Sequence, residues 1–81
     1  MKVRLLYFAV LRDVTGKRDD VLELPEGTRA ADVWLRMRDE HRALREYVRP
    51  PMTAINESYA DAEQVLRDGD ELAFIPPVAG G

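Results

Sequence analysis

The sequence lacks several residue types that carry common chemistries. It contains no cysteine, which excludes disulfides, thiolate metal sites and a cysteine nucleophile, and is typical of a reducing, cytoplasmic compartment. With a single histidine, a zinc site would need carboxylates for nearly all its ligands, so no metal site is expected. No apolar run approaches the roughly 20 residues that span a bilayer, and residues 1–5 are too charged for a signal peptide.

A basic excess is also missing. Lysine and arginine number 12 against 15 aspartates and glutamates, and the resulting formal charge of -3 argues against nucleic acid as a partner. The 81 residues are enough for one small domain, and 46% apolar and 33% charged residues are the balance of a soluble globular protein. We therefore expect a single folded domain that binds neither nucleic acid nor membrane.

The hydrophobic pattern predicts an α+β domain. The first and last apolar segments are the most hydrophobic, so we expect them to form the central, parallel pair of a small mixed sheet. A single amphipathic helix would cover one face of this sheet, with Thr28 as its N-cap and Trp34 and Met37 in its buried stripe. The predicted elements are strands at residues 2–8, 21–24, 52–56, near 59 and at 71–75, a short helix at 10–15 and the main helix to about residue 40, with a second piece to residue 48.

Strand alternation divides the side chains of the two central strands between two faces. Leu5 and Leu72 are expected under the helix, and Phe8 and Ile75 on the opposite face, where Tyr59 would join them. An exposed apolar patch usually marks a docking surface, and the alternative is burial under a loop. The predicted partner-binding residues are Phe8, Tyr59, Phe74 and Ile75.

Residues 76–81 form a tail, Pro-Pro-Val-Ala-Gly-Gly, behind a domain of residues 1–75. Pro76 and Pro77 cannot donate to a strand ladder and favour an extended exit from the sheet. Gly80 and Gly81 have no Cβ and can enter a narrow channel, and at about 3.3–3.6 Å per residue residues 77–81 reach roughly 17 Å. The α-carboxylate of Gly81 becomes an electrophile when ATP converts it to a mixed anhydride. The alternative is an ordinary frayed terminus.

Several motifs together resemble one family. They are Tyr7-Phe8-Ala9 with Arg12, Ile55-Asn56, Asp68-Gly69-Asp70-Glu71, Ala73-Phe74, and Pro76-Pro77-Val78 followed by Gly80-Gly81. In this combination the chain resembles the molybdopterin synthase small subunits, sulfur carriers with a ubiquitin-like β-grasp fold. The Gly-Gly end is shared by many ubiquitin-like proteins, whereas Pro-Pro-Val-x-Gly-Gly in a chain of this size is much more specific.

The resemblance implies a reaction cycle in which the chain is a carrier without a catalytic group or bound cofactor. An activating enzyme related to that of ubiquitin would adenylate Gly81 with ATP, and a sulfur donor would convert the adenylate to a thiocarboxylate. The tail, recognised through Pro76, Pro77, Val78 and Gly80, would then enter the large synthase subunit. There the sulfur would pass to cyclic pyranopterin monophosphate, and two such transfers would build the dithiolene. An assembly of two small and two large subunits is expected.

Three alternatives compete with this interpretation. The chain could carry sulfur for another pathway, such as thiazole synthesis or tRNA thiolation, although the Pro-Pro sequence and the chain length favour the molybdopterin branch. It could instead modify proteins by joining Gly81 to their lysines. A non-covalent ubiquitin-like binding module ranks last, because it gives no reason for the Gly-Gly end. His41 has no carboxylate partner by spacing, so we expect a packing or surface role for it rather than general-base catalysis.

Overall fold

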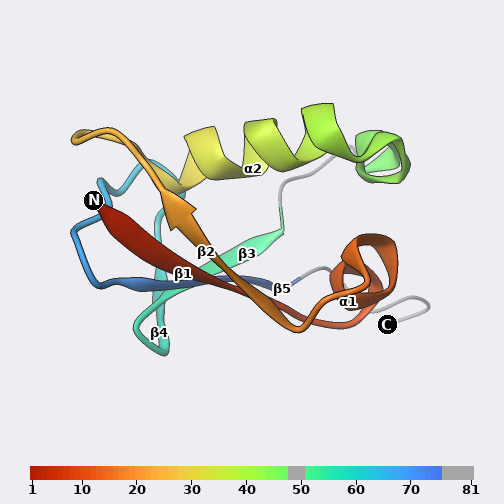
Figure 1. Ribbon diagram of the computed structural model, residues 1–81, viewed down its shortest axis with the longest axis horizontal. Coiled ribbons are helices and arrows are strands. Elements are labelled where there is room, and N and C mark those ends of the chain that lie inside the picture. Colours follow the sequence, from red (N-terminus) through yellow and green to blue (C-terminus); the bar gives the residue numbers. More distant parts are fainter. Residues whose placement is uncertain (48–50, 76–81) are drawn as a thin grey trace.

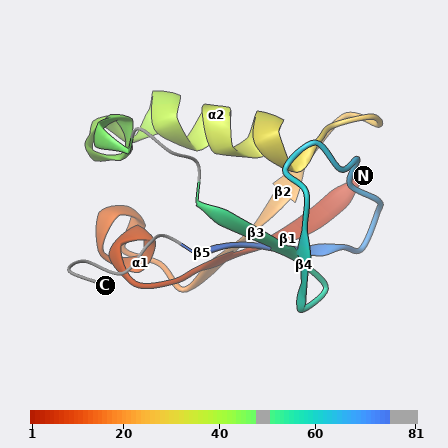
Figure 2. The same cartoon turned by 180° about the vertical axis from the view of Figure 1, so that it is seen from behind.

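The computed structural model describes residues 1–47 and 51–75 and contains a five-stranded sheet with one main helix along one side (Figure 1). Figure 2 shows the same arrangement from behind, and in the described residues no helix lies on the opposite side of the sheet. The elements are β1 (Lys2–Tyr7), α1 (Val10–Thr15), β2 (Asp19–Glu23), α2 (Ala30–Glu40), the 3-10 helix η1 (Arg42–Glu46), β3 (Met52–Ile55), β4 (Ser58–Ala60) and β5 (Glu71–Ile75). The expected α+β class is confirmed.

The first and last strands form the centre of the sheet, as predicted. The strand order is β2-β1-β5-β3-β4, and β1 and β5 are parallel, with Leu5 opposite Leu72 and Tyr7 opposite Phe74. β2 pairs antiparallel with β1, and β3 pairs antiparallel with both β5 and β4. β2 begins at Asp19, two residues before the predicted start, because the ladder with β1 already includes the Leu6–Asp19 pair.

The core lies between the sheet and α2. Trp34 meets Phe74 edge-on at a ring-centroid distance of 5.3 Å, and Tyr47, after η1, meets Trp34 at 6.4 Å. Tyr7 is buried in the same layer, where desolvation raises the pKa of its phenol, with Asp20 and Glu40 adding to the rise. The largest side chains with almost no exposed surface are Val3, Leu5, Leu11, Val33, Leu44, Leu66, Leu72 and Phe74.

The predicted N-cap of the main helix is wrong by one residue. α2 begins at Ala30 with Arg29 as its N-cap, and the Asp32 carboxylate accepts a hydrogen bond from the Arg29 backbone N–H at 2.9 Å. Thr28 is instead part of an extended connection, where its carbonyl accepts from the Leu66 N–H at 2.9 Å. Its hydroxyl turns back to donate to the Pro25 carbonyl at 2.7 Å, so it is not available to the helix.

Candidate functional site

The side of the sheet away from α2, here called the open face, carries a shallow apolar depression of about 230 Å³. Its floor is made of small side chains, because Ala73 of β5 lies opposite Leu6 of β1 and Ala54 of β3. Larger side chains form the rim, since Tyr59 lies opposite Ala54 in the β3–β4 pair. The full lining consists of Leu6, Phe8, Ala54, Glu57, Tyr59, Glu71, Ala73 and Ile75.

Three of the four predicted partner-binding residues meet at this depression. Phe8 and Tyr59 are 40% and 72% exposed, and Ile75 is half-buried beside them. Two large aromatic side chains left partly in water on one face form the kind of patch that usually docks a partner. The predicted position of these residues is confirmed, and their role stays a prediction.

Phe74, the fourth predicted partner-binding residue, belongs to the opposite side of the sheet. Its side chain is 1% exposed and packs against Trp34 of the covering helix. The physical reason is the two-residue period of a strand, which sends Phe74 and its neighbour Ile75 to opposite faces. A partner on the open face therefore cannot contact the Phe74 ring, and the structure assigns this residue to the core.

Met52 and Ala54 also belong to the open face but were not among the predicted residues. Met52 lies opposite Ile75 in the β3–β5 ladder and is 55% exposed, and Ala54 lies two residues further along the same face. Alternation along residues 52–56 predicts that these two side chains share a face. It does not predict which face, because that depends on the register with β5.

The other end of the open face is charged and internally paired. Arg4 Nη2 donates to Asp19 Oδ2 at 2.8 Å, and Arg4 Nη1 lies 3.5 Å from Glu71 Oε2. The hydrogen bond to Asp19, and then the negative charge of that residue, raise the pKa of the Arg4 guanidinium. The open face is thus divided into an apolar end, around the depression, and a charged end, around Arg4. Ile75 ends β5 at the apolar end, and residue 76 follows it in the chain.

The residues predicted to carry the chemistry lie outside the described residues. These are Gly81, the predicted sulfur-bearing residue, and the tail-recognition residues Gly80, Val78, Pro77 and Pro76. Within residues 1–47 and 51–75, no three acidic or histidine side chains are grouped as metal ligands would be. None of the helices in this part of the chain combines the length and apolar character needed to cross a membrane.

Comparison with known proteins agrees with the fold and extends over the whole chain. Residues 5–81 match the ThiS family. A molybdopterin synthase sulfur carrier subunit from Chlamydomonas reinhardtii is 35% identical, with both chains covered completely. A putative molybdopterin converting factor, subunit 1, from Pyrococcus furiosus has a TM-score of 0.81 at 32% identity, covering 95% of this chain and 98% of its own.

A third similarity is to the small archaeal modifier protein 1 from Methanosarcina acetivorans, with a TM-score of 0.76 and 26% identity. It covers 99% of this chain and 96% of its own. The sheet order, the covering helix α2 and these full-length similarities agree with the β-grasp fold that the motifs imply. On this basis, the chain belongs to the ThiS family.

Proposed function

We propose that this protein is the sulfur carrier subunit of a molybdopterin synthase. The observation that carries the proposal is the full-length similarity to a curated sulfur carrier subunit, within a family match that includes Gly80 and Gly81. The relative is named a subunit, which supports a second, larger subunit as the partner of this chain. The absence of cysteine is in keeping with a cytoplasmic location. It also fits a carrier that handles sulfur only at its terminus.

The chemistry proposed for Gly81 requires no catalytic side chain of this protein. A carboxylate oxygen attacks the α-phosphate of ATP on the activating enzyme, which gives the acyl adenylate and releases pyrophosphate. Sulfide-level sulfur from a donor then attacks the acyl carbon, AMP leaves, and the product is a thiocarboxylate. In the large subunit this sulfur is transferred to cyclic pyranopterin monophosphate, water returns Gly81 to the carboxylate, and a second charged carrier supplies the second sulfur of the dithiolene.

The open face supports the way in which the carrier would dock. Its apolar end includes Ile75, so a partner seated on the depression lies beside the point where the tail begins. Burial of Phe8 and Tyr59 would supply apolar area, while the charged end stays paired within the carrier. We propose that the large subunit binds here, in an assembly of two small and two large subunits, and that the activating enzyme uses the same end.

Removal of Gly81 tests the carrier role. The truncated chain should keep the unfolding temperature of the parent, because the core ends at β5, and should lose both adenylation and pterin sulfuration. Intact-mass spectrometry after incubation with the activating enzyme, ATP and a sulfur donor should show the replacement of one oxygen by sulfur only in the parent chain. Sulfuration by the truncated chain would overturn the proposal.

A second variant tests whether the tail must pass through a narrow channel, separately from the reaction of the Gly81 carboxylate. Gly80→Val keeps the terminal carboxylate but adds a β-branched side chain to the part of the tail that must enter a narrow channel. It should leave stability unchanged and reduce transfer strongly. Full activity of this variant would argue against a narrow channel without affecting the role of Gly81.

A second candidate function is attachment to other proteins, which the similarity to a small archaeal modifier protein favours. In this case Gly81 would form an amide with lysines of the targets instead of a thiocarboxylate. Affinity-tagged chain expressed in its own cells would then appear in higher-mass conjugates that disappear when Gly81 is deleted. Recovery of thiazole-forming or tRNA-thiolating enzymes with the tagged chain, in place of the large synthase subunit, would favour another sulfur pathway.

A further inference from the structure

The outer edge of β2 is a free strand edge whose central hydrogen-bond donor is already occupied. Within residues 1–47 and 51–75, β2 is the first strand in the sheet order, so only one of its sides is paired, with β1. A free edge of this length can add a strand from another chain, and proteins usually carry features that prevent this. The opposite edge, β4, has three residues and offers a much shorter ladder.

The backbone hydrogen bonds define which groups of β2 face outward. Leu24 exchanges two 2.9 Å bonds with Met1, and the Arg18 carbonyl accepts from the Tyr7 N–H at 2.9 Å. In an antiparallel pair, residues alternate between facing the partner strand and facing away from it. The even-numbered residues of this strand therefore face β1, and the backbone groups of Val21, in the middle of β2, face outward.

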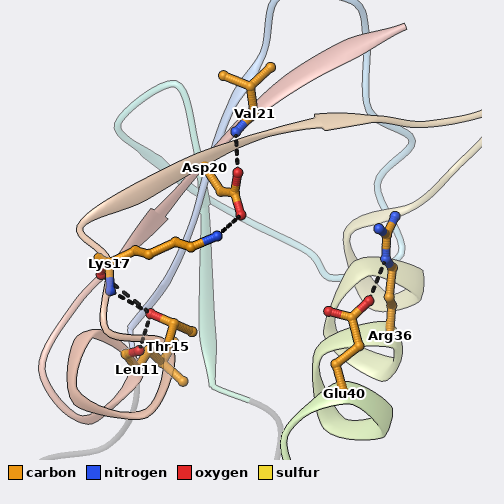
Figure 3. Close-up of polar contacts among 7 residues, drawn as sticks. All are labelled: Leu11, Thr15, Lys17, Asp20, Val21, Arg36 and Glu40. Atoms are coloured by element: carbon orange, nitrogen blue, oxygen red, sulfur yellow. Dashed lines mark hydrogen bonds and ion pairs between the residues drawn. The ribbon is translucent and has the colours of Figure 1, made fainter.

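The side chain of Asp20 closes this outward position. Its Oδ1 accepts the Val21 N–H at 3.0 Å, and its Oδ2 lies 3.2 Å from the Lys17 ammonium, which holds the carboxylate in place (Figure 3). An incoming strand would need this N–H as the donor of a ladder bond. It would therefore first have to displace a charged acceptor, and hydrogen bonds to charged groups are stronger than those between neutral groups.

Apart from this contact, the strand has properties that favour addition of a second copy. Val21 is 61% exposed on the open face, where a β-branched side chain suits cross-strand packing. In an antiparallel pair of two β2 strands centred on Val21, Asp19 of one copy would lie opposite Glu23 of the other. This like-charge contact is weakened because Arg4 and Lys2 already pair with these two carboxylates.

We propose that Asp20, held by Lys17, keeps the β2 edge closed to pairing with the β2 strand of a second copy of this chain. The inference does not depend on sulfur transfer, because it rests only on the edge and its hydrogen bonds. Removing the carboxylate frees the Val21 N–H. The chain then joins edge to edge into an antiparallel dimer through β2.

The test compares three single variants by sedimentation equilibrium and by NMR over a wide concentration range. Asp20→Ala should raise the self-association constant about tenfold or more relative to the parent. This factor is expected because the Val21 N–H no longer has to give up its bond to a charged acceptor before it pairs with another strand. In this variant the amide signals of β2 should move with concentration, and in its dilute monomer the Val21 amide should exchange with solvent faster than in the parent. Asp39→Ala is the matched control, because it removes the same charge from an exposed carboxylate on α2 rather than on β2.

Asp20→Asn separates the hydrogen bond from the charge. Its amide oxygen can still accept from Val21 but is neutral and loses the ion pair with Lys17, so this variant should associate more than the parent and less than Asp20→Ala, with Val21 exchange between the two. The proposal is overturned if Asp20→Ala associates no more than Asp39→Ala. It is also overturned if Asp20→Asn and Asp20→Ala associate equally, or if association of Asp20→Ala moves amide signals outside β2 only.

Discussion

The two faces of the sheet use neighbouring residues of the same strands for different purposes. On the covered face, Leu5, Leu72 and Phe74 are at most 1% exposed, and they pack under α2. On the open face, Phe8 is 40% exposed and Ile75 is half-buried, although both are as apolar as the residues beneath the helix. The difference lies in what covers each face. One layer is completed by α2, whereas no helix covers the other within residues 1–47 and 51–75.

Within the open face, the two ends also differ. The charged end satisfies its own groups, since Arg4 is shared between Asp19 and Glu71. The apolar end has no equivalent cover in the described residues, so its side chains gain contacts only when another surface arrives. Substitutions on the two faces, and on the two ends, should therefore differ in whether they affect stability or binding.

The largest effect on stability is expected on the covered face. Leu72→Ala removes a side chain with no exposed surface and leaves a cavity opposite Leu5, which should lower the free energy of unfolding by roughly 2–5 kcal/mol. Denaturant unfolding of the isolated chain measures this loss. Affinity for the large subunit, corrected for the folded fraction, should stay near that of the parent. A loss of stability no larger than that of Ile75→Ala would erase the distinction between the faces.

At the apolar end of the open face, substitutions should weaken binding more than they lower stability. Phe8→Ala and Ile75→Ala remove side chains that are partly in water, so each should cost about 1 kcal/mol of stability, roughly half the value of full burial. Each should weaken binding of the large subunit about tenfold or more, because this area is buried only in the complex. Titration calorimetry with the purified large subunit measures the binding. Unchanged affinity in both variants would mean that docking occurs elsewhere.

The charged end of the open face should contribute less to stability than the covered face or the apolar end. Arg4→Ala removes two ion pairs in which the arginine and Asp19 are largely exposed, and such pairs contribute little because solvent screens them. Thermal unfolding should show a smaller loss than in Phe8→Ala, and the difference from the parent should shrink as salt is added. A loss comparable to that of Leu72→Ala would show that this end is as important to the fold as the core.

The smallest effect is expected at the exposed start of the covering helix. A side-chain hydrogen bond from Arg29, followed by its backbone N–H at 2.9 Å, holds the pKa of Asp32 below its ordinary value. A lowered pKa in the folded state means that this contact stabilises fully above the unfolded-state pKa of about 3.9 and is lost as the pH falls through the folded-state value. NMR titration of the Asp32 carboxyl should show this, with a higher pKa in Arg29→Ala. An identical pKa in both proteins would contradict the assigned cause.

Much of this arrangement could be predicted from local patterns. The alternation along residues 2–8 and 71–75 correctly predicts that Leu5 and Leu72 are buried, and that Phe8 and Ile75 share the other face. Gly69 lies in the turn before β5 and has a φ of 85°, a backbone conformation that favours glycine. These features depend on the geometry of a few consecutive residues, so they can be recognised without knowing the rest of the fold.

Other features depend on contacts between distant segments. The start of α2 moved from the predicted cap at Thr28 because Leu66, far along the chain, binds its carbonyl. Met52 joined the open face through the register of β3 with β5. The closed edge of β2 could not be predicted from the sequence either, because an aspartate followed by a valine is a common pair. The bond between the Asp20 carboxylate and the Val21 N–H matters only because β2 lies at the edge of the sheet.

Local patterns in the chain were therefore enough to predict the class of the domain, the two-sided character of its central strands and the family to which the tail motif points, because periodicity and short motifs are local properties. Which exposed side chains meet depends instead on how distant segments pair in the folded sheet. A depression shared by β1, β3, β4 and β5 forms only when segments separated by tens of residues are paired in one register. The same pairing leaves β2 at the edge, and this position gives Asp20 a backbone donor to bind.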